Sequence, residues 1–321
     1  MRTHERSHHD VVVVGSRCAG GATAMLLARA GHDVVVIDRC RFPSDVVSTH
    51  GLARGGVVQL SRWGLLGAVL ASGAPPVRSV LFRRDDTEVT RRIKDRAGVD
   101  LLVAPRRTIL DSLLVDAADA AGATVRTGVT ATGVRRDHDG RVIGVEARAA
   151  DGASMELTAR HVVGADGLRS RTAGWFGAEV LESFTADIAT FYAYVADVPW
   201  PAYEFHIAAD GFAGVFPTHD GEGCVWLIRP TPALRQLRGA GADRPAALVD
   251  ELARVSPTLT ARVRAGRVTS PVRGVAGLPN HVRQPVGPGW ALVGDAGYHR
   301  DPITGHGITD AFRDAELLAT A

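Results

Sequence analysis

Lysine is nearly missing from this chain of 321 residues: Lys94 is the only one, and arginine supplies the rest of the 37 basic residues. Lys94 lies in the charged run RRIKDR, so a mechanism that needs a catalytic lysine has one poorly placed candidate. Cysteine is also scarce. Cys18, Cys40 and Cys224 are too widely scattered to form a metal cluster or a disulfide framework. We therefore predict no metal site and a reducing, cytoplasmic location.

Long hydrophobic runs are absent as well. No segment approaches the roughly 20 apolar residues that a membrane helix needs, so we predict no stable membrane insertion. The polar start MRTHERSHHD has no apolar signal core, and we expect a frayed tail there, with His4, His8 and His9 in it. A formal net charge of +2 argues against a nucleic-acid partner. The chain is 45% hydrophobic, an ordinary globular balance.

The N-terminal part has the pattern of a βαβ unit. Residues 11–14 are four valines, which is typical of a strand buried in a parallel sheet. A helix is predicted from about 22 to 30, and a second buried strand spans 34–37. The turn between the first strand and the helix reads GSRCAGG. This order of elements and this length fit a dinucleotide-binding unit.

The turn itself carries most of a dinucleotide fingerprint. Gly15 permits the tight turn and Gly20 permits close packing of the helix. Asp38 ends the second strand 23 residues after Gly15, where an acid meets a ribose hydroxyl. Arg17 stands where the middle glycine is expected, and its side chain hinders the phosphates unless it points away or binds them itself. Without further motifs, any doubly wound βαβ turn explains the same pattern.

Two later stretches repeat the scheme of an acid after a strand. One reads GADGLRSR from Gly164, and the other reads GDA from Gly294. The second continues through Pro302, Gly305 and Gly307 into a predicted helix. An acid there can accept hydrogen bonds from sugar or ribityl hydroxyls, and the glycines let N–H groups approach an electron-rich ring. Either stretch alone is typical of an ordinary turn.

Other elements follow from periodicity and turn residues. We predict a helix over 51–66, a hairpin over 77–82 and 88–93, a short strand over 101–104, a helix from Thr108 with Asp111 at capping-box spacing, a β-meander over 128–157, and strands over 184–198, 211–216 and 224–228. The aromatic residues concentrate between 184 and 226. About half of them are expected to be ordinary sheet core, because alternate strand residues face opposite ways.

Taken together, the three motifs resemble those of the FAD-dependent monooxygenases of the p-hydroxybenzoate hydroxylase fold and the related geranylgeranyl-reductase-like flavoproteins. The resemblance spans nearly the whole chain. It implies an α/β fold with a doubly wound, Rossmann-like FAD-binding domain that includes a β-meander. It also implies an inserted α+β substrate domain on a mostly antiparallel sheet. The predicted FAD-binding domain is 1–75, 100–178 and 270–321, and the substrate domain is 76–99 and 179–269.

The resemblance also implies a set of site residues. In cofactor binding it implicates Gly15, Arg17, Gly20, Asp38, Arg39, Arg107, Asp166, Gly294, Asp295, Pro302, Gly305, His306 and Gly307. Arg107 would contact the phosphate region, Asp295 the ribityl or pyrophosphate region, and the segment from Pro302 to Gly307 the isoalloxazine ring. Asp166 would lie near the pyrophosphate. The catalytic candidates are His50, Tyr298 and His299, and a structural role is open for each.

The implied activity is that of an NAD(P)H-dependent monooxygenase. It would use O2 and a flavin hydroperoxide to hydroxylate or epoxidise a small aromatic, polyketide-like or other hydrophobic substrate. A reductase or dehydrogenase of the geranylgeranyl-reductase-like type is the main alternative. A halogenase fits less well, because residues 225–230 match its WxWxIP motif poorly, and a non-catalytic flavin-binding protein is a further possibility.

The chain departs from the family pattern beyond Arg17. Tyr298 stands where histidine is common, with His299 one position late, and Thr309 replaces a common asparagine. Family members usually continue with more helices past the position of Ala321.

Overall fold

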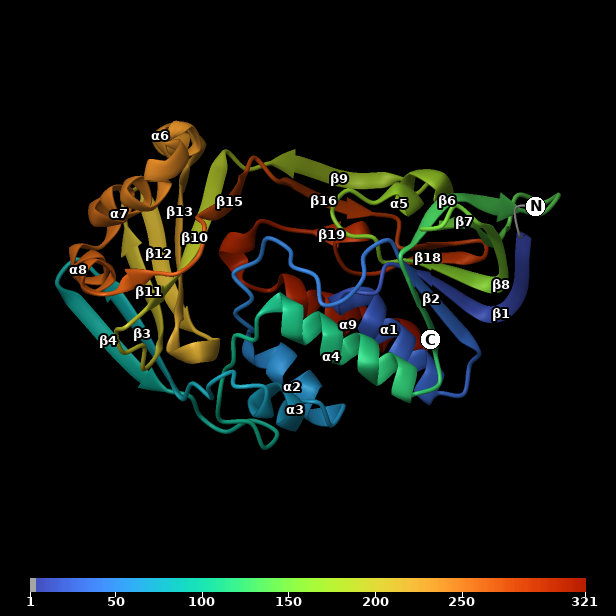
Figure 1. The fold of residues 1–321 in the computed structure, drawn as a ribbon, viewed down its shortest axis with the longest axis horizontal. Helices are drawn as coiled ribbons and strands as arrows, with labels where there is room; N and C mark the ends of the chain where they lie inside the picture. The colour runs from blue at the N-terminus through green and yellow to red at the C-terminus, as the bar shows by residue number, and fades with distance from the viewer. Residues whose placement is uncertain (1–3) are drawn as a thin grey trace.

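A central sheet of parallel strands forms one half of the molecule (Figure 1). The computed structural model describes residues 4–321, apart from the side chains of His4 and Gln236. The spatial order of the sheet is β17 (Val286–Gly287), β18 (Trp290–Leu292), β8 (Ser154–Gly164), β1 (His4–Val14), β2 (Val34–Asp38) and β5 (Thr124–Thr127). Strands β18, β8, β1, β2 and β5 run parallel. The valine-rich sequences of β1 and β2 suit this position, because both faces of the sheet are covered.

Alternate residues of β1 and β2 belong to two different cores. Val11 and Val13 pack with three helices, α1 (Cys18–Arg29), α4 (Arg107–Ala120) and α9 (Gly307–Thr320). Val12 and Val14 pack instead with the meander and with α5 (Arg171–Phe176). The meander consists of β6 (Val129–Arg136), β7 (Val142–Ala149) and the first half of β8. The predicted doubly wound α/β arrangement with a β-meander is therefore confirmed.

The polar N-terminal tail is not frayed, so this prediction is wrong for the described residues. His4 pairs with Ser154, and the register continues without a gap to His9 and Ala159. Strand β8 spans eleven residues, and its first half gives the polar segment a partner. Backbone hydrogen bonds to β8, rather than buried side chains, hold the segment in the sheet.

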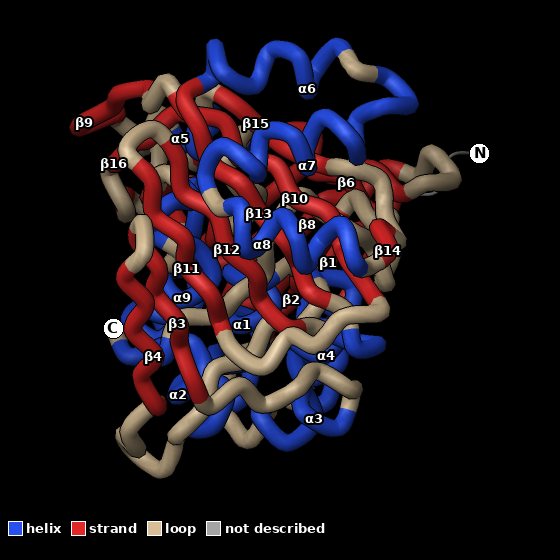
Figure 2. The backbone as a smooth tube through the Cα atoms, turned by 90° about the vertical axis from the view of Figure 1, so that its left-hand side faces the viewer, coloured by secondary structure: helices blue, strands red, loops and turns tan. Residues whose placement is uncertain are grey.

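A second sheet forms the other half of the molecule and is mostly antiparallel. Its order is β14 (Arg267–Val268), β10 (Ile188–Ala196), β13 (Gly223–Pro230), β12 (Gly211–Pro217), β11 (Tyr203–Ala208), β3 (Ser79–Arg84) and β4 (Thr87–Arg92), with β15 (Arg273–Ala276) beside β10. Only the pairing of β11 with β3 is parallel among these strands of the described chain. The small helices α6 (Arg235–Gly239), α7 (Arg244–Val255) and α8 (Pro257–Ala265) lie on one face, in front of the strands in Figure 2.

The two faces of this second sheet differ in chemistry. The face toward α6–α8 is mostly aliphatic, with Val195, Val215 and Leu227 among its buried residues, and it also includes Phe191. The opposite face belongs to the same core as α1 and α4 and carries most of the aromatic residues of the segment. They are Tyr192, Tyr194, Tyr203, Phe205, Phe212, Phe216 and Trp226. We call these seven residues the aromatic face.

Several predicted elements need correction. The predicted strand 184–198 is two strands. Strand β9 (Val180–Thr185) pairs with β16 (Pro279–Arg283), which also pairs with β19 (Tyr298–His299), in a third sheet, whereas β10 belongs to the second sheet. The predicted helix 51–66 is α2 (Arg54–Arg62) followed by α3 (Leu66–Ala71). Gly64, with φ +77°, lies between them and ends the helical path. Residues 101–104 form only a single bridge, from Leu102 to Val77.

The start of α4 also differs from its prediction. The helix begins at Arg107, and no side chain caps it, so Thr108 and Asp111 form no capping box.

Strand β15 belongs to the second sheet, although residues 270–321 are predicted to lie in the FAD-binding domain. The division into two domains otherwise stays a prediction. None of the described helices is long and apolar enough to cross a membrane.

Candidate functional site

The turn between β1 and α1 leaves no space for side chains at its two outer glycines. A Cβ atom on Gly15 would lie 2.5 Å from the carbonyl oxygen of Ala165, and Gly15 has φ +98°. A Cβ atom on Gly20 would lie 1.8 Å from the carbonyl oxygen of Gly15. The first motif is therefore packed directly against the second, and glycine is required at both positions.

Asp38 closes β2 with its side chain turned toward this same turn. Its Oδ2 accepts from the backbone N–H of Ser16 at 2.8 Å and from the Ser16 hydroxyl at 3.2 Å. Its Oδ1 accepts from the N–H of Cys40 at 2.7 Å. Three of the roughly four acceptor positions of a carboxylate are thus occupied. Arg39 follows directly and is exposed.

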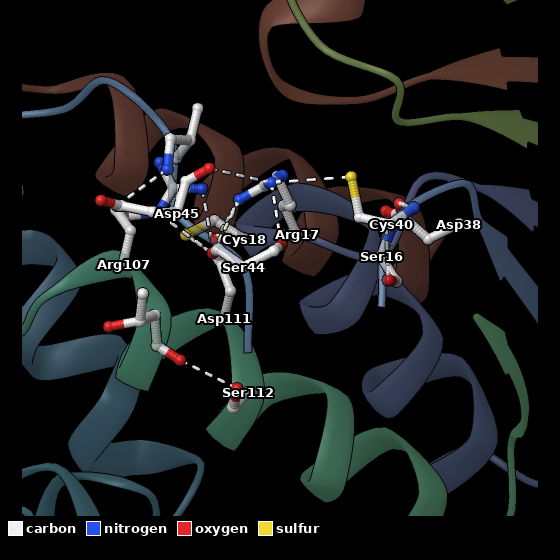
Figure 3. Close-up of polar contacts among 12 residues, drawn as sticks. Ser16, Arg17, Cys18, Asp38, Cys40, Ser44, Asp45, Arg107, Asp111 and Ser112 are labelled. Carbon is white, nitrogen blue, oxygen red and sulfur yellow. Dashed lines mark hydrogen bonds and ion pairs between the residues drawn. The ribbon is translucent and has the colours of Figure 1, made fainter. Parts of the chain in front are cut away.

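A fully buried carboxylate, Asp111 of α4, gathers three donors from α1 and α4 (Figure 3). Arg17 donates to its Oδ2 at 3.0 Å, and Arg107 donates to its Oδ1 from Nε at 3.1 Å and from Nη2 at 3.0 Å. The Cys18 thiol donates to Oδ1 at 3.1 Å. Burial raises the pKa of Cys18 well above its ordinary value, so the thiol keeps its proton.

Asp166 of the second motif caps α5. Its carboxylate accepts from the hydroxyls of Ser170 and Thr172 at 2.5 and 2.6 Å and from the N–H groups of Arg171 and Thr172 at 2.8 and 3.0 Å. All four bonds stay within one turn of chain. The carboxylate of Asp166 therefore stabilises the backbone conformation of its own motif.

The carboxylate of Asp295 in the third motif is half-buried and forms no hydrogen bond with any described residue. Burial raises its pKa, the nearby His299 and Arg107 oppose that rise, and Asp310 and Asp314 add to it. The same Arg107 thus lies close to both Asp111 and Asp295. Because the Asp295 carboxylate has no hydrogen-bond partner among the described residues, it is available to accept a hydrogen bond from a ligand.

The segment from Pro302 to Gly307 is mostly open to solvent. Pro302 is half-buried, and Gly305, His306 and Gly307 are exposed. Gly305 has φ +64°, which turns the chain into α9, and no side chain caps the N-terminus of that helix. The His306 ring contacts the carbonyl oxygen of Thr304. This leaves the first N–H groups of α9 free of side-chain acceptors.

His50 lies beside the second sheet. A Cβ on its neighbour Gly51 would strike the Phe216 ring, and a Cβ on Gly56 would lie 2.9 Å from the Thr309 hydroxyl at the start of α9. His50 has φ +45°, and its Nε2 lies 3.0 Å from the Tyr194 hydroxyl. Burial lowers the pKa of His50 to about 3, so the ring is neutral. Burial also raises the pKa of Tyr194, so the phenol keeps its proton.

Tyr298 and His299 lie in β19. The Tyr298 ring is flanked by the guanidinium groups of Arg300 and Arg313 at 5.8 and 5.9 Å. His299 is buried, and its Nδ1 lies 2.5 Å from the carbonyl oxygen of Pro279. Within the described part of the chain, His50 is the one predicted catalytic residue with a hydrogen bond to the aromatic face.

Two residues of the cluster around His50 are missing from the predicted site. Tyr194 carries the hydroxyl that His50 contacts, and the Arg106 guanidinium lies 4.6 Å from the centre of the Tyr194 ring. Arg106 also pairs with Glu222. The sequence signal for Tyr194 is weak, because strand alternation with Tyr192 only indicates that the two rings share one face.

Residues 8–321 match the model of the FAD-binding domain family. The chain belongs to this FAD-binding family. A digeranylgeranylglycerophospholipid reductase of Methanopyrus kandleri is 32% identical over 93% of the chain and 73% of the relative. A menaquinone reductase of Mycolicibacterium smegmatis is 29% identical over 97% of the chain and 75% of the relative. The resemblance to this group of flavoproteins is thereby confirmed.

Solved structures of flavoproteins show the same fold. PqsL, a probable FAD-dependent monooxygenase from Pseudomonas aeruginosa, aligns with a TM-score of 0.79 and 23% identity over 98% of this chain and 85% of that one. The flavin-dependent brominase Bmp2 aligns with a TM-score of 0.83 and 20% identity over 98% and 78%. At these identities the likeness concerns the fold alone. Family and relatives together support an FAD-dependent oxidoreductase.

Proposed function

We propose that FAD lies across the N-termini of α1 and α9, with its adenosine half at the first motif. Helix α1 has no side-chain cap and no acidic residue in its first turn, so its N–H groups are free for a phosphate. Asp38 keeps one acceptor position for a ribose hydroxyl. Gly15 and Gly20 form the turn, while Arg39 and Arg107 add positive charge nearby. These features fit the ADP half of the cofactor.

The ring half of FAD suits the third motif. Asp295 offers the unpartnered carboxylate to the ribityl chain. Pro302, Gly305, His306 and Gly307 would border the isoalloxazine ring, with the free N–H groups of α9 at its pyrimidine edge. The partial positive charge of a helix N-terminus stabilises the negative charge that a reduced flavin carries there. Asp166, whose bonds are all internal, would act by shaping the turn beside Gly15.

We further propose that the enzyme reduces a hydrophobic organic substrate, of the kind its reductase relatives are named for. Bound FAD would supply the electrons, and NAD(P)H would be their source. The chain would supply the proton from the Tyr194 hydroxyl, with the neutral His50 ring holding that hydroxyl in place. The pair carries this proposal because it places a neutral imidazole against a phenol of the aromatic face, where the substrate would lie.

The aromatic face would bind the apolar part of the substrate. Phe205 stacks on Phe212 at 5.9 Å and on Phe82 at 5.2 Å between ring centres, with interplanar angles of 14° and 16°. Phe205 and Phe212 are half-buried, and Phe82 is 45% exposed. A flat or unsaturated ligand can extend such a stack and exclude water from the reacting atoms.

A second candidate is the monooxygenase reaction that the sequence resemblance implies. The same aromatic face favours it, because transfer of oxygen from a reduced flavin and O2 also needs a dry pocket. The two reactions differ in their need for oxygen. We propose the reductase first because the curated relatives at 29–32% identity are reductases.

The deciding experiment measures substrate-dependent NAD(P)H oxidation with and without O2. Prenylated quinones, polyprenyl lipids and small phenols form the panel. Turnover under strict anaerobiosis, with a reduced product, supports the reductase. Turnover that stops without O2, with one oxygen atom added to the product, supports the monooxygenase. A colourless protein that takes up no FAD refutes both proposals.

A further inference from the structure

Arg17 occupies the position where the dinucleotide fingerprint has its middle glycine. The backbone at Arg17 has φ −73° and ψ −163°, an extended conformation open to any residue. This contrasts with Gly15 and Gly20, where a Cβ atom would strike the main chain. The fold therefore requires two glycines of the fingerprint and tolerates a side chain at the third position.

The guanidinium of Arg17 stays at the N-terminal end of α1. Its Nη1 donates to Asp111 at 3.0 Å and its Nη2 donates to the Ser44 hydroxyl at 3.0 Å, with longer contacts to the carbonyl oxygens of Ser44 and Asp45 at 3.4 Å (Figure 3). Its Nε donates to no described residue. The side chain is 25% exposed, so it lines the surface of the site.

Asp111 is a carboxylate with two cationic partners. One carboxylate is shared by the two guanidinium groups of Arg17 and Arg107. The third donor, the Cys18 thiol, is neutral because burial raises its pKa. Asp45, the next carboxylate along, is already paired with Arg273 of β15. Arg107 also lies near the Asp295 carboxylate. Arg17 therefore shares its one carboxylate partner with a second guanidinium, and it lies beside the uncapped N-terminus of α1, where a dianionic diphosphate would be stabilised.

We propose that Arg17 binds the diphosphate of FAD, replacing the close backbone approach that a glycine would permit with charge-assisted hydrogen bonds. Asp111 and Ser44 hold the guanidinium at the edge of the α1 N-terminus and keep it from covering the N–H groups. The inference rests on the proposed FAD site. It predicts that Arg17→Gly, which restores the glycine of the fingerprint, weakens cofactor binding. If Arg17 merely obstructed the cofactor, the same change would tighten binding.

The test uses Arg17→Gly, with ADP, FAD and riboflavin titrated into the flavin-free protein by calorimetry. We expect ADP and FAD affinity to fall about 10- to 100-fold, as for the loss of one charge-assisted hydrogen-bonded contact, and riboflavin affinity to stay unchanged. Arg17→Lys keeps the positive charge but loses the paired N–H groups of the guanidinium. Its affinity for ADP and FAD should lie between those of the wild type and Arg17→Gly. Added NaCl should weaken ADP binding less in Arg17→Gly than in the wild type.

The matched control is Arg29→Met at the other end of α1, where the guanidinium donates to the Trp63 carbonyl oxygen at 3.0 Å. It should leave ADP affinity unchanged. Equal or tighter ADP binding by Arg17→Gly overturns the proposal. If circular dichroism shows that Arg17→Gly does not fold, Arg17→Lys decides, and wild-type affinity in that variant overturns it. A wild-type protein that binds neither ADP nor FAD refutes the FAD site itself, which is a different failure.

Discussion

The hydrogen bond between His50 and Tyr194 joins two groups that both resist ionisation. With the pKa of His50 lowered to about 3 and that of Tyr194 raised, the pair stays neutral through the ordinary pH range. Because Tyr194 keeps its proton and His50 stays neutral, the phenol is available as a proton donor to the substrate. A proton donor of this kind acts on the substrate and leaves cofactor binding untouched.

Replacing Tyr194 with Phe should therefore lower kcat by about 100-fold, the usual contribution of one general acid. FAD content and the flavin spectrum should not change. Tyr192→Phe is the matched control, because Tyr192 lies on the same face but contacts the Ser48 N–H at 3.4 Å and not His50. Equal kcat values for both variants would remove Tyr194 from the mechanism.

We expect the Asp295 carboxylate to bind the cofactor and to lower the stability of the flavin-free protein. Its raised pKa means that the folded state holds the proton more tightly than the unfolded chain, so ionisation destabilises the fold. Stability of the flavin-free protein should fall as pH rises from about 3.9 through the raised value. At pH 7, Asp295→Asn should stabilise the flavin-free protein by on the order of 1 kcal/mol and weaken FAD binding.

Thermal unfolding of flavin-free Asp295→Asn and FAD titration check both halves of this prediction. A variant that melts lower than the wild type would show that the carboxylate is stabilising. A variant with unchanged FAD affinity would show that Asp295 is not a ligand.

The glycines and acids of the site could be predicted from sequence because their spacing follows the chain. Asp111 could not be predicted correctly. Its distance from Thr108 matches a capping box, but its partners Arg17 and Cys18 lie more than 90 residues away. Tyr194 likewise meets His50 across 144 residues. Local spacing carries no information about such contacts.

At the scale of elements, β11 and α8 are tied by a buried ionic group. Glu204 of β11 is 2% exposed and accepts from Arg262 at 2.7 Å and from His206 at 3.3 Å. The His206 ring continues to the Ser256 hydroxyl at 2.8 Å, and Ser256 caps α8. Burial raises the pKa of Glu204, but the bonds from His206 and Arg262 outweigh it, and the net pKa is lowered.

Glu204→Gln should destabilise the protein by about 2–3 kcal/mol at pH 7, because Arg262 and His206 lose a charged partner. A lowered folded pKa gives stability that is present above the unfolded pKa of about 4.3 and is lost as pH falls through the folded value. The gap between variant and wild type should therefore shrink in acid. Urea unfolding at pH 7 and pH 4 measures it, with the exposed Glu182→Gln of β9 as the control. A gap that grows in acid contradicts the assignment.

Elements with a strong local signal were predictable, and those defined by a distant partner were not. The valines of β1 and the apolar stripe of α4 give clear patterns. The polar residues His4–His9 form a strand only because β8 offers its edge. The segment 184–198 is continuous in pattern, yet it splits because β9 and β10 find partners in different sheets.

At the scale of the whole molecule, FAD would contact residues from both ends of the chain, so its binding should stabilise the fold as a unit. Free FAD at 100 times its Kd should add about 2.7 kcal/mol to the free energy of unfolding. Thermal melts of flavin-free protein across an FAD series measure this increment. Riboflavin, which lacks the diphosphate, is the control and should add less. A melting temperature independent of FAD would contradict the proposed site.

The spatial order of the strands in the central sheet differs from the order in which the ribosome makes them. Strand β1 is made before the other described strands of the sheet, but its neighbour β8 follows about 150 residues later, as the pairing of His4 with Ser154 shows. At the usual rates of translation this delay is roughly 8–30 s. Asp295 and α9 emerge later still. The side of β1 that faces β8 therefore stays unpaired during this interval, and the proposed FAD site is complete only after nearly all of the described chain has left the ribosome.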